Sequence, residues 1–393
     1  MTNRIRVLFT IGSLAGGGSE RQLINILRHI DRSQFEPHLY LVSRSGEFLD
    51  QVPADVPVTA FSDEPPHQGL YIPGRIRRAQ IAHLARTLSD RRIDVVYDRT
   101  PQMTLITAPA CRQTGVPRIS TIVCDPARDI QANFRRFRRL KAFLLRRAYR
   151  SAIRVIANSQ TLASVSRDFY GIRNDRLIAI QNGFDFNDIL RLSAVEHKEA
   201  AIEVPDEAFH LVAVGRLHAQ KGFSHLIQAV VELSQHRPSS RVFLSIAGRG
   251  PDEAALRECV DDCGLNDIVR FTGFLNNPYP LIRSADLFCL TSLYEGMPNV
   301  LVEAMSLGVP VLATDCPHGP REILLDGELG SLVEANNPKA IADGIEQAMQ
   351  QRADQKVRAT RARESVLTRF SVESTTRELE ELIREVARPH ADK

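Results

Sequence analysis

The chain has 393 residues, of which 43% are apolar and 25% charged, and its formal net charge is +3 at pH 7. This length suffices for two buried domains and exceeds what one compact core usually holds. No run of 18 apolar residues occurs, and the N-terminal MTNRIRVLFTIGS lacks the apolar stretch and cleavage site of a signal peptide, so we expect neither a transmembrane helix nor export.

The first half of the chain is predicted to alternate strands and helices. A strand over 5–13 ends in the turn Gly16-Gly17-Gly18, and a helix begins at Ser19, which can cap it. The glycines do not spell G-x-G-x-x-G, so the turn either lets a ligand approach the backbone or is purely structural. Further strands are expected at 38–43, 94–100, 118–123, 154–159 and 177–183, with helices at 75–90, 103–114, 134–150 and 160–169. Repeated βα units of this kind predict a parallel, doubly wound sheet.

Charge is distributed unevenly along the chain. Residues 1–185 contain 28 Lys and Arg against 16 Asp and Glu, a net of +12, whereas the remaining 208 residues carry 22 against 31, a net of −9. Lys141 is the only lysine of the first half. Because arginine favours bidentate contact with phosphate oxygens, we expect an anionic partner for this half.

The segment 134–150, FRRFRRLKAFLLRRAYR, has eight Lys and Arg and no acid. Its apolar stripe is Phe134, Phe137, Leu140, Phe143, Leu144 and Ala148. Two interpretations remain open: a helix packed on the core with a solvated basic face, or an amphipathic surface helix that binds anionic lipid headgroups or lipid-linked phosphates. A nucleic-acid partner is disfavoured, because the basic residues are confined to one helix.

The pattern loosens over 186–208, where we place an interdomain linker, and βα units then restart. Strands are expected at 210–217, 241–250, 269–274, 286–292 and 309–315, and helices at 223–235, 252–263, near 278–284, after the 286–292 strand, at 338–351, 356–369 and near 373–388. We therefore predict domains over 1–185 and 209–372, with 373–393 as a terminal helical segment. The six cysteines are expected to be buried, reduced thiols.

Two carboxylates, Glu295 and Glu303, stand eight residues apart in YEGMPNVLVE, which follows a predicted strand. A strand, a turn and a new helix N-terminus place backbone N–H groups at the carboxyl end of a sheet, where α/β folds hold phosphates. The alternative is an ordinary loop carboxylate and a helix-surface one. In GRLHAQKGF, Arg216 and Lys221 form a possible diphosphate clamp, although cations near helix starts are also common surface residues.

Taken together, these motifs closely resemble the donor domain of the family 4 retaining glycosyltransferases. The resemblance rests on GRLHAQKGF, AGRGPDEAAL, FTGF, SLYEGMPNVLVEAMSLGVPVLATD, GPREIL and DGELG in this order, and on GGGSER, NS (158–159) and QNGFD (181–185) in the first half. It covers nearly the whole chain and implies the GT-B fold: two Rossmann-like domains facing across a cleft, with the C-terminal helix returning to the first.

The resemblance also implies residue roles. Arg216 and Lys221 would bind the donor diphosphate, Glu295 the hydroxyls of the transferred sugar, and Glu303 the ribose. The remaining donor-binding residues that it implies are Gly17, Arg249, Gly296, Met297, Pro298, Asn299 and Val300. Many relatives carry a His after the strand at 118–123; this chain has Asp125 nearby, whose role in acceptor binding stays open.

The expected function is retaining transfer of a hexosyl or N-acetylhexosaminyl group from a nucleotide sugar, UDP first among them, to a lipid-linked or cell-surface glycan. No D-x-D triplet occurs, so we expect no metal and no other cofactor. DCPHGPREIL resembles bacterial enzymes of lipid-linked oligosaccharide, capsule and lipopolysaccharide synthesis, which with the 134–150 segment predicts a cytoplasmic enzyme peripheral on the inner membrane face. The alternatives are a GT-B nucleotide-sugar epimerase or hydrolase, and a non-catalytic two-lobed sugar-binding protein.

Overall fold

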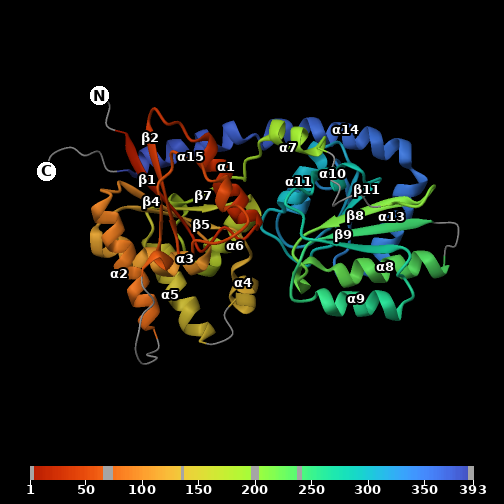
Figure 1. The fold of residues 1–393 in the computed structure, drawn as a ribbon, viewed down its shortest axis with the longest axis horizontal. Helices are drawn as coiled ribbons and strands as arrows, with labels where there is room; N and C mark the ends of the chain where they lie inside the picture. Colours follow the sequence, from red (N-terminus) through yellow and green to blue (C-terminus); the bar gives the residue numbers. More distant parts are fainter. Residues whose placement is uncertain (1–3, 65–73, 134–136, 196–202, 237–240, 388–393) are drawn as a thin grey trace. The chain divides into compact units, whose positions relative to one another are not determined.

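A computed structural model of the chain describes residues 4–64, 74–133, 137–195, 203–236 and 241–387. The chain divides into two compact units: unit 1 contains Met1–Phe184 with Val372–Lys393, and unit 2 contains Asp185–Ser371. Each unit is built on its own parallel sheet (Figure 1). The predicted fold class, two Rossmann-like α/β domains, is therefore confirmed.

Unit 1 contains a seven-stranded sheet whose recorded strand pairs are all parallel. Its strands are β1 (Ile5–Ile11), β2 (Phe35–Leu41), β3 (Val58–Ala60), β4 (Val95–Arg99), β5 (Arg118–Ile122), β6 (Arg154–Ala157) and β7 (Leu177–Ala179). They lie in the order β3-β2-β1-β4-β5-β6-β7. The order reverses between β1 and β4, and ligands of doubly wound folds bind at the carboxyl ends of strands at such a switch point.

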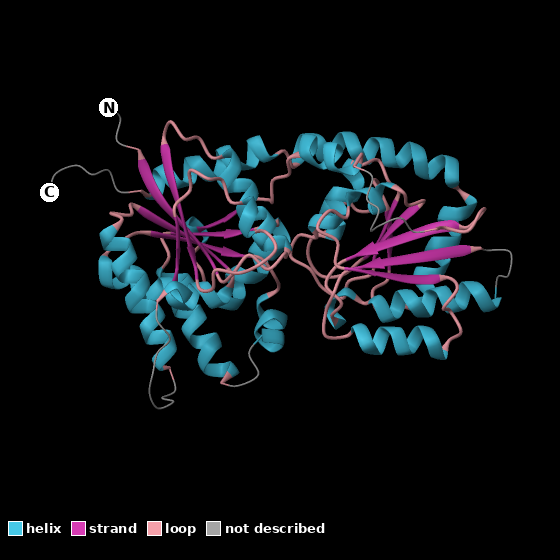
Figure 2. Ribbon diagram, viewed as in Figure 1, coloured by secondary structure: helices cyan, strands magenta, loops and turns pink. Residues whose placement is uncertain are grey.

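Helices pack on both faces of this sheet (Figure 2). They are α1 (Gly18–His29), α2 (Arg75–Asp90), α3 (Pro101–Thr114), α4 (Pro126–Asn133), α5 (Arg138–Ser151), α6 (Gln160–Tyr170) and α15 (Val372–Val386), with short 3-10 helices at Leu49–Gln51, Phe61–Asp63 and Asn174–Arg176. Successive side chains of a strand point to opposite faces, so Phe9 packs with α1 and α15 while Leu8 packs with α2 and α3. Such two-sided burial accounts for the continuous apolar runs of the strands.

Several elements of unit 1 differ from the sequence-based expectation. The segment 124–133, for which the sequence predicts no helix, contains α4, and Oδ1 of Asp125 accepts a hydrogen bond from the Arg128 amide at 2.9 Å, as an N-cap residue does. The predicted helix 134–150 is observed as α5, while 134–136 lie outside the described residues. Helix α1 begins one residue early, so Gly17 and not Ser19 occupies the N-cap position.

Helix α15 completes the core of unit 1 although it is distant in sequence. Leu379, Leu382 and Ile383 are buried in the same cluster as Phe9. Oε1 of Glu380 accepts a hydrogen bond from the Asp31 amide at 2.8 Å. Without this helix, one face of the sheet would expose a large apolar surface.

A fully buried ion pair lies within unit 1 at the β4–β5 pair. Nη1 of Arg118 lies 2.9 Å from Oδ2 of Asp98, and their side chains are 3% and 0% exposed. The Asp98 carboxylate also accepts hydrogen bonds from the hydroxyls of Thr104 (2.6 Å), Thr107 (2.6 Å) and Ser120 (2.8 Å). Burial of this charge is thus offset by an opposite charge and three donors.

Unit 2 contains a six-stranded sheet of order β10-β9-β8-β11-β12-β13, again with parallel recorded pairs. Its strands are β8 (Phe209–Val214), β9 (Val242–Ala247), β10 (Val269–Gly273), β11 (Leu287–Leu290), β12 (Val311–Thr314) and β13 (Ser331–Val333). Its helices are α7 (Phe186–Ser193), α8 (Phe223–His236), α9 (Glu253–Asp262), α10 (Tyr279–Arg283), α11 (Asn299–Ser306), α12 (Pro320–Ile323), α13 (Pro338–Gln350) and α14 (Arg352–Arg369), with a 3-10 helix at Ala219–Lys221. The strand order reverses between β8 and β11.

The segment 186–208, expected as a linker, begins with α7. Asp185 caps this helix through a 2.9 Å hydrogen bond from the Asp188 amide. The side-chain amide of Asn277 donates to the Leu192 carbonyl at 2.8 Å, which fixes α7 within unit 2. The start of the segment is therefore part of a packed unit, and 196–202 lie outside the described residues.

The cysteines are free thiols, as expected, but not all are buried. Cys111, Cys289 and Cys316 are buried, Cys124 and Cys259 are half-buried, and Cys263 is exposed. Burial raises the pKa of Cys111 and of Cys289 to about 12, so both stay protonated at neutral pH. Within the described ranges, no group of three or more His, Cys, Asp or Glu is placed to hold a metal ion, and no helix has the length and apolar content to cross a bilayer.

Candidate functional site

The structure brings Lys221 and Glu295 together at the switch point of the unit 2 sheet. Lys221 follows β8 and Glu295 follows the neighbouring strand β11, so the two residues are 74 positions apart in the chain. Nζ of Lys221 lies 2.5 Å from Oε1 of Glu295, and the side chains are 19% and 7% exposed. A cation and a carboxylate of predicted function thus form one ion pair at the edge where such sheets bind ligands.

Hydrogen bonds fix the Glu295 carboxylate in place. The hydroxyl of Ser292 donates to the same Oε1 at 2.6 Å, and the Glu295 amide donates to the Pro317 carbonyl at 3.1 Å. Burial, with the negative charge of Glu295 adding to it, raises the pKa of the neighbouring Cys316 thiol to about 12. Glu295 is therefore held as a directed acceptor and is not a mobile loop carboxylate.

The two loops that carry the pair are tied to each other. The side-chain amide of Gln220 donates to the Tyr294 carbonyl at 2.9 Å, and the Gln220 carbonyl accepts from the Leu293 amide at 2.8 Å. The hydroxyl of Thr291 donates to the Lys221 carbonyl at 3.0 Å. Sequence reasoning missed Ser292, Gln220 and Thr291; their only signal was their position beside the strand ends.

The turn after Glu295 runs directly into helix α11. Gly296, Met297 and Pro298 are buried, and Asn299 and Val300, the first helical residues, are partly exposed. Gly319 packs against this turn with φ +89°, and a Cβ there would lie 2.5 Å from Cδ of Pro298. The turn therefore has little room to rearrange, and the positive end of the α11 dipole lies next to it.

Glu303 lies in the middle of α11 and is 5% exposed. Glu303 is therefore not the helix-surface carboxylate of the alternative interpretation, and Glu295, although it stands in a loop as that interpretation has it, is only 6% exposed. Carboxylates are rarely buried without a structural or ligand-binding reason.

Arg216 and Arg249 are exposed at the carboxyl ends of β8 and β9. Within the described residues, neither side chain forms a hydrogen bond or ion pair, so the structure does not join them to the Lys221–Glu295 pair. Gly17 is exposed in the loop after β1 of unit 1. His218, in the same loop as Arg216, accepts a hydrogen bond at Nδ1 from the Gln220 amide at 3.2 Å and caps the 3-10 helix.

Family profiles match most of the chain in two consecutive parts. The profile "Glycosyltransferase Family 4" matches residues 16–188, and "Glycosyl transferases group 1" matches 195–365. The first match falls on unit 1 and the start of unit 2, and the second lies entirely within unit 2.

Relatives of the chain include bacterial glycosyltransferases. A lipopolysaccharide core biosynthesis glycosyltransferase of Rhizobium meliloti, LpsE, is 29% identical over 58% of this chain and 63% of its own length. A Campylobacter jejuni enzyme named as an N-acetylgalactosaminyltransferase acting on a diphospho-undecaprenol-linked sugar is 25% identical over 85% of this chain and 87% of its own. Of three of these curated relatives, LpsE among them, the chain spans only 43%, 63% and 50% of the length.

A solved structure with the same fold is that of HepE from Anabaena in complex with UDP and glucose. It is 25% identical, with a TM-score of 0.80 over 97% of this chain and 100% of that one. Sucrose-phosphate synthase of Thermosynechococcus elongatus, at 16% identity and a TM-score of 0.79, shares the fold. With its two matching domains, its GT-B architecture and these relatives, the chain belongs to the glycosyltransferases that join a family 4 domain to a group 1 domain.

Proposed function

We propose that the chain is a retaining transferase that moves a hexosyl or N-acetylhexosaminyl group from a nucleotide sugar, UDP first among them, to a hydroxyl of a lipid-linked or cell-surface glycan. The observation that carries this proposal is the Lys221–Glu295 pair at the switch point of unit 2. HepE, whose fold the chain shares, was solved with UDP and glucose, and the Campylobacter relative is named for a diphospho-undecaprenol-linked acceptor.

In this proposal the buried carboxylates bind different parts of the donor. Glu295, held by Lys221 and Ser292, accepts hydrogen bonds from hydroxyls of the transferred sugar, while Glu303 accepts them from the ribose. The backbone of Gly296–Val300 and the α11 N-terminus bind sugar and phosphate oxygens. Arg249 completes the donor contacts of unit 2, nearest the base.

Lys221 and Arg216 stabilise the negative charge that grows on the leaving diphosphate. An oxocarbenium-like sugar is then attacked on the face that the leaving group vacates, and a diphosphate oxygen takes the proton of the acceptor hydroxyl. Because cationic side chains and helix amides supply the charge stabilisation, this mechanism needs no metal ion. The proposed mechanism assigns no step to Asp125, whose Oδ1 accepts the capping hydrogen bond of α4.

An assay of donor turnover distinguishes a glycosyltransferase from the alternative enzyme, a nucleotide-sugar epimerase or hydrolase. Purified protein is supplied with UDP-sugars, alone and with an undecaprenyl-diphosphate-linked glycan, and products are separated by chromatography. We expect the donor to be consumed mainly when acceptor is present, with an α-linked product from an α-linked donor. Turnover that is independent of acceptor, yielding an epimer or free sugar, would support the epimerase or hydrolase and contradict our proposal.

Helix α5 supports a membrane-facing role for unit 1. Its inner face buries Leu145 and Tyr149, whereas Phe137, Leu140 and Phe143 are 73%, 54% and 60% exposed. Exposed arginines flank this apolar face at 138, 139, 146, 147 and 150. Such a surface suits an anionic bilayer, where apolar side chains insert and cations bind headgroups. We propose that the protein docks here on the cytoplasmic face of the membrane.

Replacing Leu140 and Phe143 together by glutamate is expected to weaken binding to vesicles containing phosphatidylglycerol by about tenfold or more, since each buried apolar side chain contributes about 1.5–3 kcal/mol. Co-sedimentation measures the bound fraction. Val357→Glu, which changes an exposed apolar residue of α14, is the matched control and should bind like the parent. Binding that ignores lipid charge and salt, or that survives the double substitution, would refute docking through α5.

A further inference from the structure

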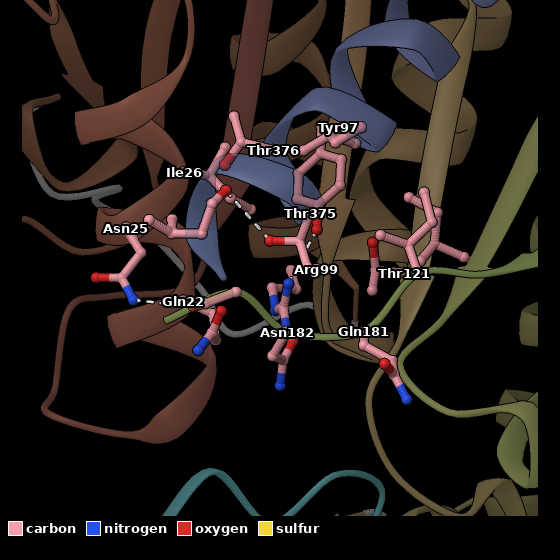
Figure 3. Close-up of a pocket in the computed structure, with 15 residues that line it drawn as sticks. Gln22, Asn25, Ile26, Tyr97, Arg99, Thr121, Gln181, Asn182, Thr375 and Thr376 are labelled. Atoms are coloured by element: carbon pink, nitrogen blue, oxygen red, sulfur yellow. Dashed lines mark hydrogen bonds between the residues drawn. The ribbon is translucent and has the colours of Figure 1, made fainter. Parts of the chain in front are cut away.

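A cavity of about 30 Å³ with polar and apolar lining residues lies at the carboxyl edge of the unit 1 sheet (Figure 3). Its lining comes from α1, the ends of β4, β5 and β6, the segment 180–183 after β7, and the first turns of α15. Asn25, Ile26 and Gln181 are partly exposed at its edge. Space of this size holds about two water molecules or a group of similar size. It lies where the strand order of unit 1 reverses, the usual ligand position in such sheets.

Four buried polar atoms around this cavity have no hydrogen-bond partner within the described chain. They are Nε2 of Gln22, Nε of Arg99, Oγ1 of Thr121 and Oγ1 of Thr376, on side chains whose residues are 1–4% exposed. The close-up shows all four residues around one space (Figure 3). Each of these atoms can donate a hydrogen bond, and the amide and guanidinium nitrogens can only donate. Their common requirement is therefore an acceptor.

Arg99 brings a positive charge to the cavity without a counter-charge. Its Nη1 donates to the Tyr97 hydroxyl at 2.9 Å and its Nη2 to Oδ1 of Asn182 at 2.7 Å, both neutral groups. No described carboxylate forms an ion pair with it, whereas Arg118, equally buried, is paired with Asp98. A buried guanidinium is costly unless an opposite charge accompanies it.

Helix α15 adds a second positive feature. Val372, Thr375 and Thr376, which line the cavity, belong to its first turns, where the helix dipole is positive. Gly183 allows this approach, because a Cβ there would come within 1.9 Å of Oγ1 of Thr375. The Arg99 guanidinium, the unpartnered hydrogen-bond donors and the N-terminus of α15 thus all favour a negatively charged ligand.

We propose that this cavity binds a small oxyanion of the phosphate class through Arg99, Gln22, Thr121 and Thr376. The ligand is either free inorganic phosphate or the phosphate of a phosphorylated sugar. The site is distinct from the Lys221–Glu295 pair and belongs wholly to unit 1. Phosphate binding at this site can be tested without measuring sugar transfer.

The thermal unfolding midpoint of the full chain measures binding. Inorganic phosphate at tenfold its dissociation constant is expected to raise the midpoint by about 2–3 °C, compared with sodium chloride of equal ionic strength. The variant Arg216→Ala/Lys221→Ala, which lacks the cations proposed to bind the donor diphosphate, should keep this shift. Arg99→Gln should lose it, while Arg112→Gln, which removes an exposed arginine of α3, should keep it.

Thr376→Val provides a test that keeps the charge and shape of the site, should Arg99→Gln fold poorly. Loss of a hydrogen bond to a charged ligand is expected to weaken phosphate binding by about tenfold or more. Glucose 6-phosphate distinguishes the source: tighter binding than inorganic phosphate identifies a sugar substituent, and equal or weaker binding identifies the free ion. A shift that chloride reproduces, or that persists in both Arg99→Gln and Thr376→Val, would overturn the proposal and leave a cavity that holds water.

Discussion

Replacing Glu295 with alanine is expected to lower the rate of sugar transfer by about 10²–10³-fold, the effect of losing one directed polar contact to the reacting group. The carboxylate is fixed by Lys221 at 2.5 Å and Ser292 at 2.6 Å, so its contacts with the donor sugar are preorganised. Its removal also leaves Lys221 without its partner beside the diphosphate. Initial rates with saturating donor and acceptor measure the change.

A double-mutant cycle tests whether the pair acts as one unit. Lys221→Ala alone should cause a similar loss, and Glu295→Ala/Lys221→Ala should be only slightly worse than either single variant, because the partners share one function. Glu258→Ala, an exposed acid of α9, is the control and should retain full activity. Full transfer activity of a folded Glu295→Ala enzyme would show that the assignment of this site is wrong.

Asp98→Asn is expected to lower the free energy of unfolding by about 3–5 kcal/mol, because it leaves the Arg118 guanidinium buried without a counter-charge. Arg118 is also anchored by its Nη2, which donates to the Ala148 carbonyl at 2.6 Å, so it cannot easily move to solvent. Urea unfolding followed by circular dichroism measures the loss. The three hydroxyls that donate to Asp98 would lose part of their acceptor charge as well.

Two further variants show whether the stability loss comes from the buried, unpaired charge of Arg118 or from replacing any aspartate by asparagine. Asp168→Asn, at an exposed acid of α6 paired with Arg167, should leave the urea midpoint almost unchanged. Asp98→Leu/Arg118→Met removes both charges and should recover part of the stability lost in Asp98→Asn. If Asp98→Asn unfolded at the parent midpoint, the ion pair would contribute nothing to the stability of unit 1.

The order and type of most elements could be predicted from the sequence, because two-sided burial gives continuous apolar strands between amphipathic helices. Strand β3 was missed: it has three residues at the edge of the sheet, too few for any period to show. Helix α4 was missed because its composition is polar, although Asp125 followed by Pro126 is a helix-start signal that could have been used.

The candidate site was predicted in part. The positions of Lys221 and Glu295 after two strands were visible in the sequence, but their direct contact depends on the pairing of β8 with β11, which no local pattern encodes. The orientation of α5 was not predictable either. The predicted apolar stripe includes Phe143 and omits Leu145 and Tyr149, yet Leu145 and Tyr149 face inward and Phe143 faces out, because tertiary packing and not periodicity decides which apolar side is buried. The cavity at Arg99 left no trace in the sequence because its lining comes from distant segments.

The hydrogen bond between the Val372 amide and the Phe184 carbonyl, 3.0 Å long, joins the residue where the chain leaves unit 1 to the one where it returns. Unit 2 is consequently an insertion within unit 1. During synthesis, the sheet of unit 1 emerges first but lacks the helix that covers one of its faces until α15 has left the ribosome. Unit 2, continuous in sequence, can complete its own core before then. The earlier-made half of this protein is thus the last to finish folding, and it must remain soluble with an apolar face uncovered while the ribosome adds the 187 residues from Asp185 to Ser371.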